Sequence, residues 1–135
     1  MSSIPPAFHD LFEKQTLAHL ATQLPNGFPH VTPVWIDYDD DDGHLLFNTA
    51  RGRQKVRNVE SDPRVGASMC DPDDPYRYCS LWGEVVDLTT DGAVAHIDAL
   101  ARRYMDVEEY PYHGDDEGER LIVRIEPARV LTNES

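Results

Sequence analysis

Residues 17–38 read LAHLATQLPNGFPHVTPVWIDY, and this stretch decides how the fold begins. The apolar run Leu17–Thr22 predicts a largely buried strand. Pro25-Asn26-Gly27 predicts a tight turn, because Asn-Gly is a strong signal for a short hairpin. The return strand is predicted over Pro29–Tyr38, where Pro33 has no amide to donate and so indicates a sheet edge or a bend. The chain therefore opens with an antiparallel hairpin.

Outward from this hairpin, the sequence predicts four more strands and three helices. The strands are expected at His44–Thr49, Arg64–Cys70, Tyr78–Leu88 (with Gly83 at a bulge or close backbone approach) and Arg120–Leu131. The helices are expected at about Pro6–Lys14, at about Arg53–Ser61, and from Thr90 or Asp91 to Tyr104, while residues 106–119 form a loop. Six strands joined by short turns close most economically as an antiparallel barrel flanked by helices. We expect a mainly β protein in which residues 1–135 form one domain.

The charge balance excludes two classes of partner. The 135 residues include 25 Asp and Glu against 12 Lys and Arg, a formal charge of −13. Such a surface repels nucleic acid and anionic membranes, so neither is an expected partner. Only two of the cations are lysines, Lys14 and Lys55, and an acidic, lysine-poor composition predicts adaptation to concentrated salt, which screens self-repulsion. Without a membrane span or signal peptide, and with two cysteines, the chain is expected to be cytoplasmic.

Other chemistries find little support in the sequence. The run of four aspartates that starts at Asp39 does not fit a calcium loop, because counting from Asp37 places Asp42 where glycine is required and Asn48 where glutamate is required. The six histidines and two cysteines show no metal-ligand spacing. No GxSxG sequence marks a nucleophile. We therefore predict a solvated turn at the aspartates and no metal site.

Residues 48–58, NTARGRQKVRN, hold four of the twelve cations where a strand gives way to a helix. The first amides of a helix lack backbone partners and attract anions. Arg53 and Lys55 would add charge-assisted hydrogen bonds, and Thr49 a hydroxyl, around one phosphate. The alternative is a solvated helix end whose cations pair with neighbouring acids. The stretch predicts a phosphate-binding site without excluding that alternative.

The chain as a whole resembles the flavin/deazaflavin oxidoreductases, which are split-barrel proteins related to pyridoxamine 5′-phosphate oxidase, and within them the small enzymes that depend on coenzyme F420. The resemblance rests on the order of several short stretches along nearly the whole chain. These are residues 20–22 with Asn26-Gly27, 29–35, 46–49, 53–58, 62–65, 71–78 and Gly83. It implies a six-stranded antiparallel split β-barrel of the FMN-binding type. It also implies a homodimer with cofactor sites between the subunits.

The resemblance also implies roles for particular residues. Thr49, Arg53, Gln54 and Lys55 would hold the cofactor phosphate, and the strand Pro33, Val34, Trp35 would offer backbone groups to the ring. Tyr76, Arg77 and Tyr78 would reach the cofactor from the other subunit. Asn48 and Arg51 complete the predicted cofactor-binding set.

The activity implied is transfer of a hydride between coenzyme F420 and a small unsaturated organic substrate. The alternative is an FMN-binding protein, either a flavin oxidoreductase or a non-catalytic binder or sensor. The oxidase branch has a C-terminal substrate segment, whereas this chain ends at Ser135, so pyridoxamine phosphate oxidation is not expected. The cofactor carries the reactive carbon, so no acid–base constellation is needed. Tyr78, His30, His113 and solvent remain alternatives for the proton donor.

Overall fold

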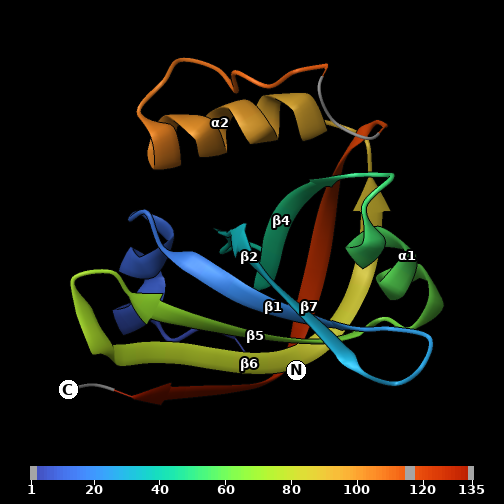
Figure 1. The fold of residues 1–135 in the computed structure, drawn as a ribbon. Helices are drawn as coiled ribbons and strands as arrows, with labels where there is room; N and C mark the ends of the chain where they lie inside the picture. The colour runs from blue at the N-terminus through green and yellow to red at the C-terminus, as the bar shows by residue number, and fades with distance from the viewer. Residues whose placement is uncertain (1–2, 115–117, 134–135) are drawn as a thin grey trace.

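The hairpin expected at residues 17–38 is present in the computed structural model, which describes residues 3–114 and 118–133. The strands are β1 (Leu17–Gln23), β2 (Pro29–Trp35), β3 (Asp37–Asp39), β4 (His44–Ala50), β5 (Arg64–Asp71), β6 (Asp74–Thr89) and β7 (Arg120–Asn133). The helices are the 3₁₀ helix η1 (Pro6–Phe12), α1 (Gln54–Ser61) and α2 (Ala93–Met105). All strand pairs are antiparallel, and Figure 1 shows the sheet curling into a half-barrel with α2 lying across one end.

The described sheet has seven strands rather than the predicted six, in the order β2-β1-β5-β6-β7-β4-β3. The extra strand arises because the segment predicted as one strand over Pro29–Tyr38 breaks at Ile36. The amide of Ile36 donates to the Tyr104 hydroxyl at 3.1 Å, and its carbonyl accepts from Arg103 Nη1 at 2.9 Å. Because β2 and β3 form the two edges of the sheet, the chain at Ile36 crosses directly from one edge to the other. This crossing brings the edges of the curled sheet together.

Several predicted boundaries also differ from those observed. The segment predicted as a helix at Pro6–Lys14 is a 3₁₀ helix that ends at Phe12. Strand β6 begins at Asp74 rather than Tyr78, so the turn after β5 is tighter than expected. Gly92 caps α2 in the left-handed conformation, with φ of 73°, in place of a side-chain cap from Thr90 or Asp91.

The long strand β6 joins the two parts of the sheet, since it pairs with β5 along one side and β7 along the other. Its register to β7 shifts between Trp82 and Gly83, as the glycine predicted. A Cβ at Gly83 would overlap the Glu126 carbonyl oxygen and approach Pro127 Cα to 2.9 Å. Glycine therefore permits this close backbone approach.

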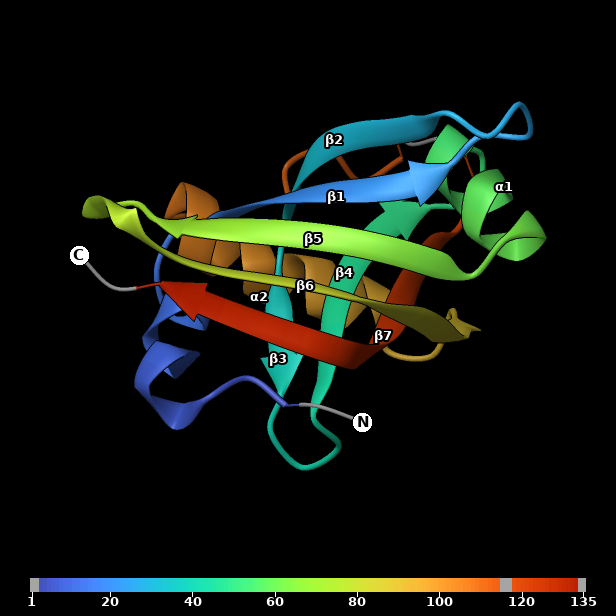
Figure 2. The same ribbon diagram turned by 90° about the horizontal axis from the view of Figure 1, so that it is seen from below.

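The buried core cluster combines apolar side chains from η1, from α1 and from the strands β1, β4, β5, β6 and β7. The largest fully buried members include Phe47, Leu11, Leu20, Met69 and Ile125. Buried Asn58 docks α1 on β1 through a 3.0 Å hydrogen bond from its Nδ2 to Thr22 Oγ1. Figure 2 shows β2, β1, β5, β6 and β7 side by side, with α2 behind them. No helix in the described ranges is long and apolar enough to cross a membrane.

Candidate functional site

A cavity of about 450 Å³ lies between α2 with its following segment, the strands β2 and β4, and the start of α1. Seven of the twelve residues predicted to bind a cofactor line it: Pro33, Val34, Trp35, Asn48, Thr49, Arg53 and Lys55. Strands β2 and β4 are separate in the sheet order, and the curl of the sheet brings them to the same cavity. We refer to this cavity as the central pocket.

Positive groups gather where α1 meets the central pocket. The cap residue of α1, Arg53, makes no side-chain capping hydrogen bond, so the first amides of the helix have no side-chain acceptor at that position. Lys55 is half-buried, and in residues 3–114 and 118–133 no acidic group pairs with its ammonium. Burial, together with the charge of Arg53, lowers the pKa of Lys55 below its usual value. An anion bound here would accept hydrogen bonds from the first amides of α1 and would offset the burial of the Lys55 charge. The donor set therefore fits a phosphate.

Gln54 and Arg51 do not line this pocket. Gln54 Nε2 donates to Asn58 Oδ1 at 2.8 Å, and its Oε1 accepts from Arg57 Nη2 at 2.8 Å. Arg51 is exposed and lies 3.5 Å from a carboxylate oxygen of Glu119. Gln54 therefore braces α1, while Arg51 takes part in a surface ion pair.

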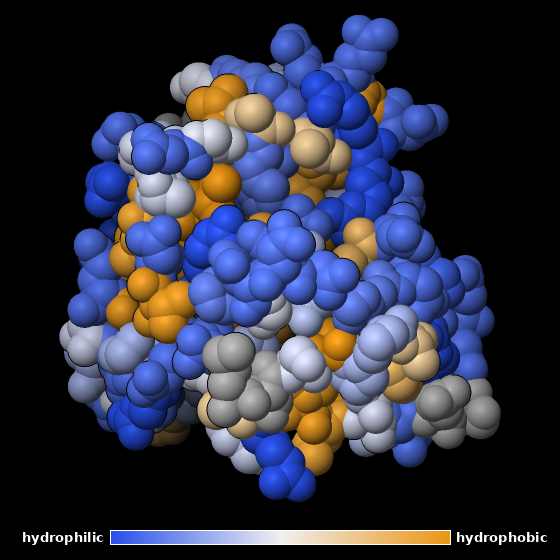
Figure 3. Space-filling model, turned by 180° about the vertical axis from the view of Figure 1, so that it is seen from behind, coloured by the Kyte–Doolittle hydropathy of each residue, from blue (hydrophilic) through white to orange (hydrophobic). Residues whose placement is uncertain are grey.

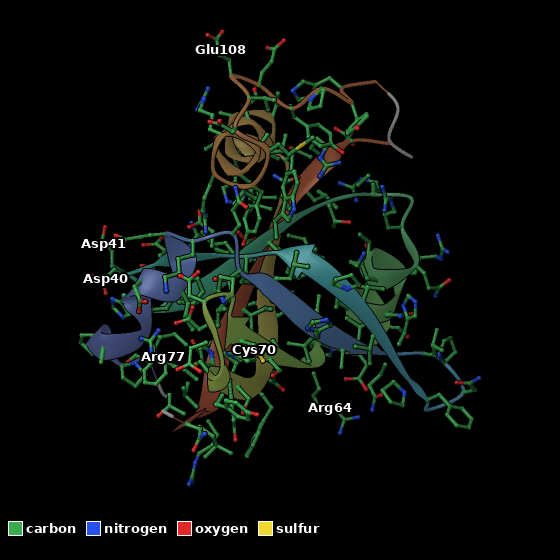
Figure 4. The ribbon with its side chains drawn as sticks, turned by 60° about the vertical axis from the view of Figure 1, so that its left-hand side comes forward. Asp40, Asp41, Arg64, Cys70, Arg77 and Glu108 are labelled. Carbon is green, nitrogen blue, oxygen red and sulfur yellow. The ribbon has the colours of Figure 1, made fainter. Side chains whose placement is uncertain are left out.

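Tyr76, Arg77 and Tyr78 also lie away from the pocket of their own chain. Arg77 packs against η1: its Nη1 is 2.8 Å from Asp71 Oδ2, its Nη2 is 2.8 Å from Asp10 Oδ1, and its guanidinium lies over the Phe8 ring. Figure 4 shows Arg77 low in the view, well below α2 and Glu108. The two tyrosines are exposed on β6.

An aromatic wall that the sequence did not predict closes one side of the central pocket. The Trp35 ring stacks on Tyr104 at 5.0 Å with an interplanar angle of 5°, and Tyr110 meets Trp35 edge-on at 6.2 Å. The Tyr104 hydroxyl donates to the Thr16 carbonyl. Burial raises the pKa of this hydroxyl, which therefore stays protonated at neutral pH.

The segment after α2, predicted only as a loop, supplies part of this wall. Asp98 on α2 holds the segment in place, because its Oδ1 accepts from the Tyr110 amide at 2.8 Å and lies 2.7 Å from His113 Nε2. The Tyr110 hydrogen bond is the main reason why the pKa of Asp98 is lowered. Tyr110, Tyr112 and Arg120 line the pocket, together with Leu17, Ile97 and Met105. The sequence analysis missed these residues, and the two tyrosines at 110 and 112 are the signal that could have indicated them.

Within the described ranges, no group of three or more histidine, cysteine or acidic side chains is arranged to hold a metal ion. The described part of the aspartate turn instead forms ion pairs: Arg124 Nη1 lies 3.0 Å from Asp39 Oδ2 and 3.3 Å from Asp42 Oδ2. Both cysteines are free, and burial raises the pKa of the Cys79 thiol to about 11. A thiol of that pKa is a poor nucleophile at neutral pH.

Solved structures with the same fold include functionally described proteins. An F420 reductase superposes with a TM-score of 0.79 at 34% sequence identity, over 95% of this chain and 98% of the other. A conserved hypothetical protein from Mycobacterium tuberculosis superposes with a TM-score of 0.76 at 25% identity, over 97% of this chain and 85% of the other. A putative pyridoxamine 5′-phosphate oxidase from Listeria innocua, at 18% identity and a TM-score of 0.65 over 93% of each chain, shares the fold.

Comparison with the curated proteins gave no match. The family model described as pyridoxamine 5′-phosphate oxidase, however, matches residues 4–134. This match, together with the split-barrel neighbours, confirms the family and the fold class expected from the sequence, with seven strands in place of six. The chain therefore belongs to the pyridoxamine 5′-phosphate oxidase family of split-barrel proteins.

Proposed function

We propose that this protein is an oxidoreductase that binds coenzyme F420 in the central pocket and acts on a small unsaturated organic substrate. One observation carries the proposal: the pocket joins the cationic start of α1 to the strand Pro33–Trp35, so that a phosphate site and a flat apolar wall share one cavity. The 34% identity to an F420 reductase over nearly the full length of both chains supports F420 over FMN.

Different residues of the pocket would bind different parts of the cofactor. Lys55, Arg53 and Thr49, with the first amides of α1, would hold the phosphate. The backbone of Pro33–Trp35 would lie along the ring, and the stacked Trp35 and Tyr104 would exclude water from it. When bound, the cofactor would supply hydride transfer. The contribution of the protein is position and electrostatics.

Not every residue predicted to bind the cofactor is retained in this proposal. The guanidinium of Arg77 is held by two aspartates, and Gln54 is hydrogen-bonded within α1. Tyr76 and Tyr78 stay in it as exposed groups that a second subunit could place against the cofactor. The proposed assembly is therefore a homodimer.

The proposal is tested by titrating the purified protein with F420 and with FMN side by side in molar KCl. A charge-assisted contact to a phosphate contributes about 1.5–3 kcal/mol, so Lys55→Ala should raise the Kd for F420 at least ~10-fold. The control is Arg64→Ala, which removes an exposed cation that pairs with Asp62 outside the pocket, and it should leave the Kd unchanged.

Two results would count against the proposal. If Lys55→Ala binds F420 as tightly as the wild type, the cations at 53 and 55 are a charged helix end and not a phosphate site. If the wild type binds FMN tightly and F420 not at all, the protein belongs with the FMN users, and turnover assays would then separate a flavin oxidoreductase from a binder.

A further inference from the structure

A chain of hydrogen bonds runs from Asp37 into the central pocket, where it includes Arg120. Arg120 Nε donates to Asn48 Oδ1 at 2.8 Å. Asn48 Nδ2 donates to the Ala93 carbonyl at 2.8 Å and lies 3.2 Å from His96 Nδ1. His96 Nε2 in turn lies 3.1 Å from Asp37 Oδ2. The chain connects β7, β4, α2 and β3.

The donor and acceptor groups of these side chains fix the direction of each hydrogen bond in the series. Arginine only donates, so the oxygen of the Asn48 amide must face Arg120, and the Asn48 nitrogen must face His96. His96 Nδ1 is therefore the acceptor, and His96 carries its proton on Nε2, which donates to Asp37. Both hydrogens of the Asn48 amide are committed to protein acceptors, which leaves its oxygen as the group that orients Arg120.

Asp37 lies at the opposite end of this series of hydrogen bonds from Arg120, and it is ionised. Its burial opposes ionisation, but hydrogen bonds from His96 and the Tyr38 amide, together with the charge of Arg103, outweigh that cost and hold the pKa of Asp37 below its usual value. Arg103 Nη2 lies 3.3 Å from Asp37 Oδ1. The chain of hydrogen bonds therefore links a fixed negative charge to a positively charged residue that lines the pocket.

Arg120 lies beside the aromatic wall. Its guanidinium carbon is 5.3 Å from the centre of the Tyr110 ring, and Tyr110 meets the Trp35 ring edge-on. The phosphate site proposed above uses other cations, Arg53 and Lys55, at the start of α1. An arginine held over an aromatic ring suits a flat ligand that carries a carboxylate, since the planar guanidinium can donate two parallel hydrogen bonds to it.

We propose that Arg120, oriented by Asn48, determines specificity in the central pocket by selecting planar unsaturated substrates that carry a carboxylate next to the conjugated plane. This inference rests on the proposed function and names its substrate class. The same carboxylate chemistry could also come from the acidic tail of the cofactor, so the experiment needs separate arms for the substrate and the cofactor.

The probes are trans-cinnamate and its uncharged analogue trans-cinnamamide, bound to the cofactor-free protein and followed by quenching of tryptophan fluorescence. We expect the wild type to prefer the acid. Arg120→Gln should weaken cinnamate binding at least ~10-fold and change the Kd for cinnamamide and for F420 by less than about 2-fold. Arg124→Gln, on the same strand but outside the pocket, should keep the preference for the acid.

Asn48→Leu tests the positioning role, because it keeps Arg120 but removes the oxygen that orients it. The ratio of the two Kd values should fall towards one, whereas a merely structural defect would weaken both probes alike. Loss of F420 binding in Arg120→Gln with cinnamate unchanged would assign Arg120 to the cofactor and overturn the proposal. So would wild-type protein that fails to bind cinnamate saturably. Neither result depends on Lys55→Ala, which tests the phosphate site separately.

Discussion

Arg77 was predicted to bind the cofactor, but its side chain pairs with two aspartates and contributes to the fold instead. The Arg77 side chain is 17% exposed and Asp71 only 5%, and Lys14 Nζ adds a contact of 2.9 Å to Asp71 Oδ1. The Asp73 amide and the two cations outweigh the burial of Asp71 and lower its pKa to about 2. This cluster links η1 to the β5–β6 turn. Arg77 therefore stabilises the fold, whereas Lys55 lines the central pocket.

The Arg77 cluster predicts how the protein loses stability in acid. A carboxyl whose pKa is lower in the folded than in the unfolded chain stabilises the fold above its unfolded pKa, about 3.9, and loses that contribution as pH falls towards about 2. Wild-type protein should therefore lose stability between about pH 5 and pH 2. Arg77→Ala should cost about 1.5–3 kcal/mol at pH 7, because it removes one charged partner of Asp71 while Lys14 and the Asp73 amide remain.

The measurement is the free energy of unfolding in urea as a function of pH. Asp71→Asn should flatten the acid limb, while Asp40→Asn, on the exposed aspartate turn, serves as the control and should leave it unchanged. An acid limb that is the same in wild type and Asp71→Asn would contradict the account of the cluster.

At the scale of the elements, β6 and β7 hold the two parts of the sheet together. They remain paired from Tyr78↔Asn133 to Thr89↔Ile122, across two register shifts. The first shift sits at Gly83, where the backbone of β7 approaches closely. Because β7 also pairs with β4, the register of this strand places Arg120 opposite Ala50 and thereby in the central pocket.

Gly83→Ala should disrupt the fold, because the added methyl overlaps the backbone of β7 and no side-chain rotation can relieve it. We expect a loss of several kcal/mol or failure to fold, measured by thermal melting followed by circular dichroism. Gly66→Ala is the matched control on the neighbouring strand. Among the described residues of its own chain, its methyl would meet only the Leu81 carbonyl oxygen, at 3.7 Å, and melting close to the wild type is expected. Equal melting of the two variants would refute the close approach.

The whole molecule presents a sheet face that no helix covers in Figure 2. Trp82 on β6 lies opposite Gly66 on β5, which lies opposite Ala21 on β1, and Ala21 in turn lies opposite Val31 on β2. Exposed Trp82 and Val31 thus flank small residues, which permit close approach of another sheet. We propose this face as the homodimer interface. A stable one should bury more than ~2,000 Å² in total.

The dimer is tested by light scattering in molar KCl. Trp82→Asp places a charge on a side chain that is 54% exposed in the single chain and should yield monomers. Phe28→Asp changes a residue that is 68% exposed on the β1–β2 turn and should leave the dimer intact. A monomeric wild type at micromolar concentration would remove the shared-site proposal.

The acid excess is a second property of the whole molecule. Figure 3 shows a face dominated by hydrophilic residues and interrupted by apolar patches. With a formal charge of −13, self-repulsion should loosen the fold in dilute buffer and be screened at high salt. We expect the Tm to rise steadily as KCl increases from dilute buffer to molar levels. A flat or falling Tm over that range would show that the acidity is not a salt adaptation.

Features that depend on near neighbours in the chain could be predicted from the sequence. The Asn26-Gly27 turn, the bulge at Gly83 and the cation cluster around Lys55 could be read locally, because turn chemistry, alternation and helix-end electrostatics act over a few residues. The family resemblance rests on the order of short motifs along the chain, and the family match confirms the family.

Contacts between groups far apart in the chain became known only from the folded structure. Arg120 joins Asn48 across 72 positions, and Arg77 meets Asp10 across 67. The break at Ile36 depends on hydrogen bonds from α2, 67 and 68 positions away. No local preference specifies such contacts, since they exist only once the sheet has curled and α2 has packed across its end. The aromatic wall and the contacts of Arg77 therefore could be found only in the fold, whereas the predicted phosphate-binding pattern could be read from the sequence.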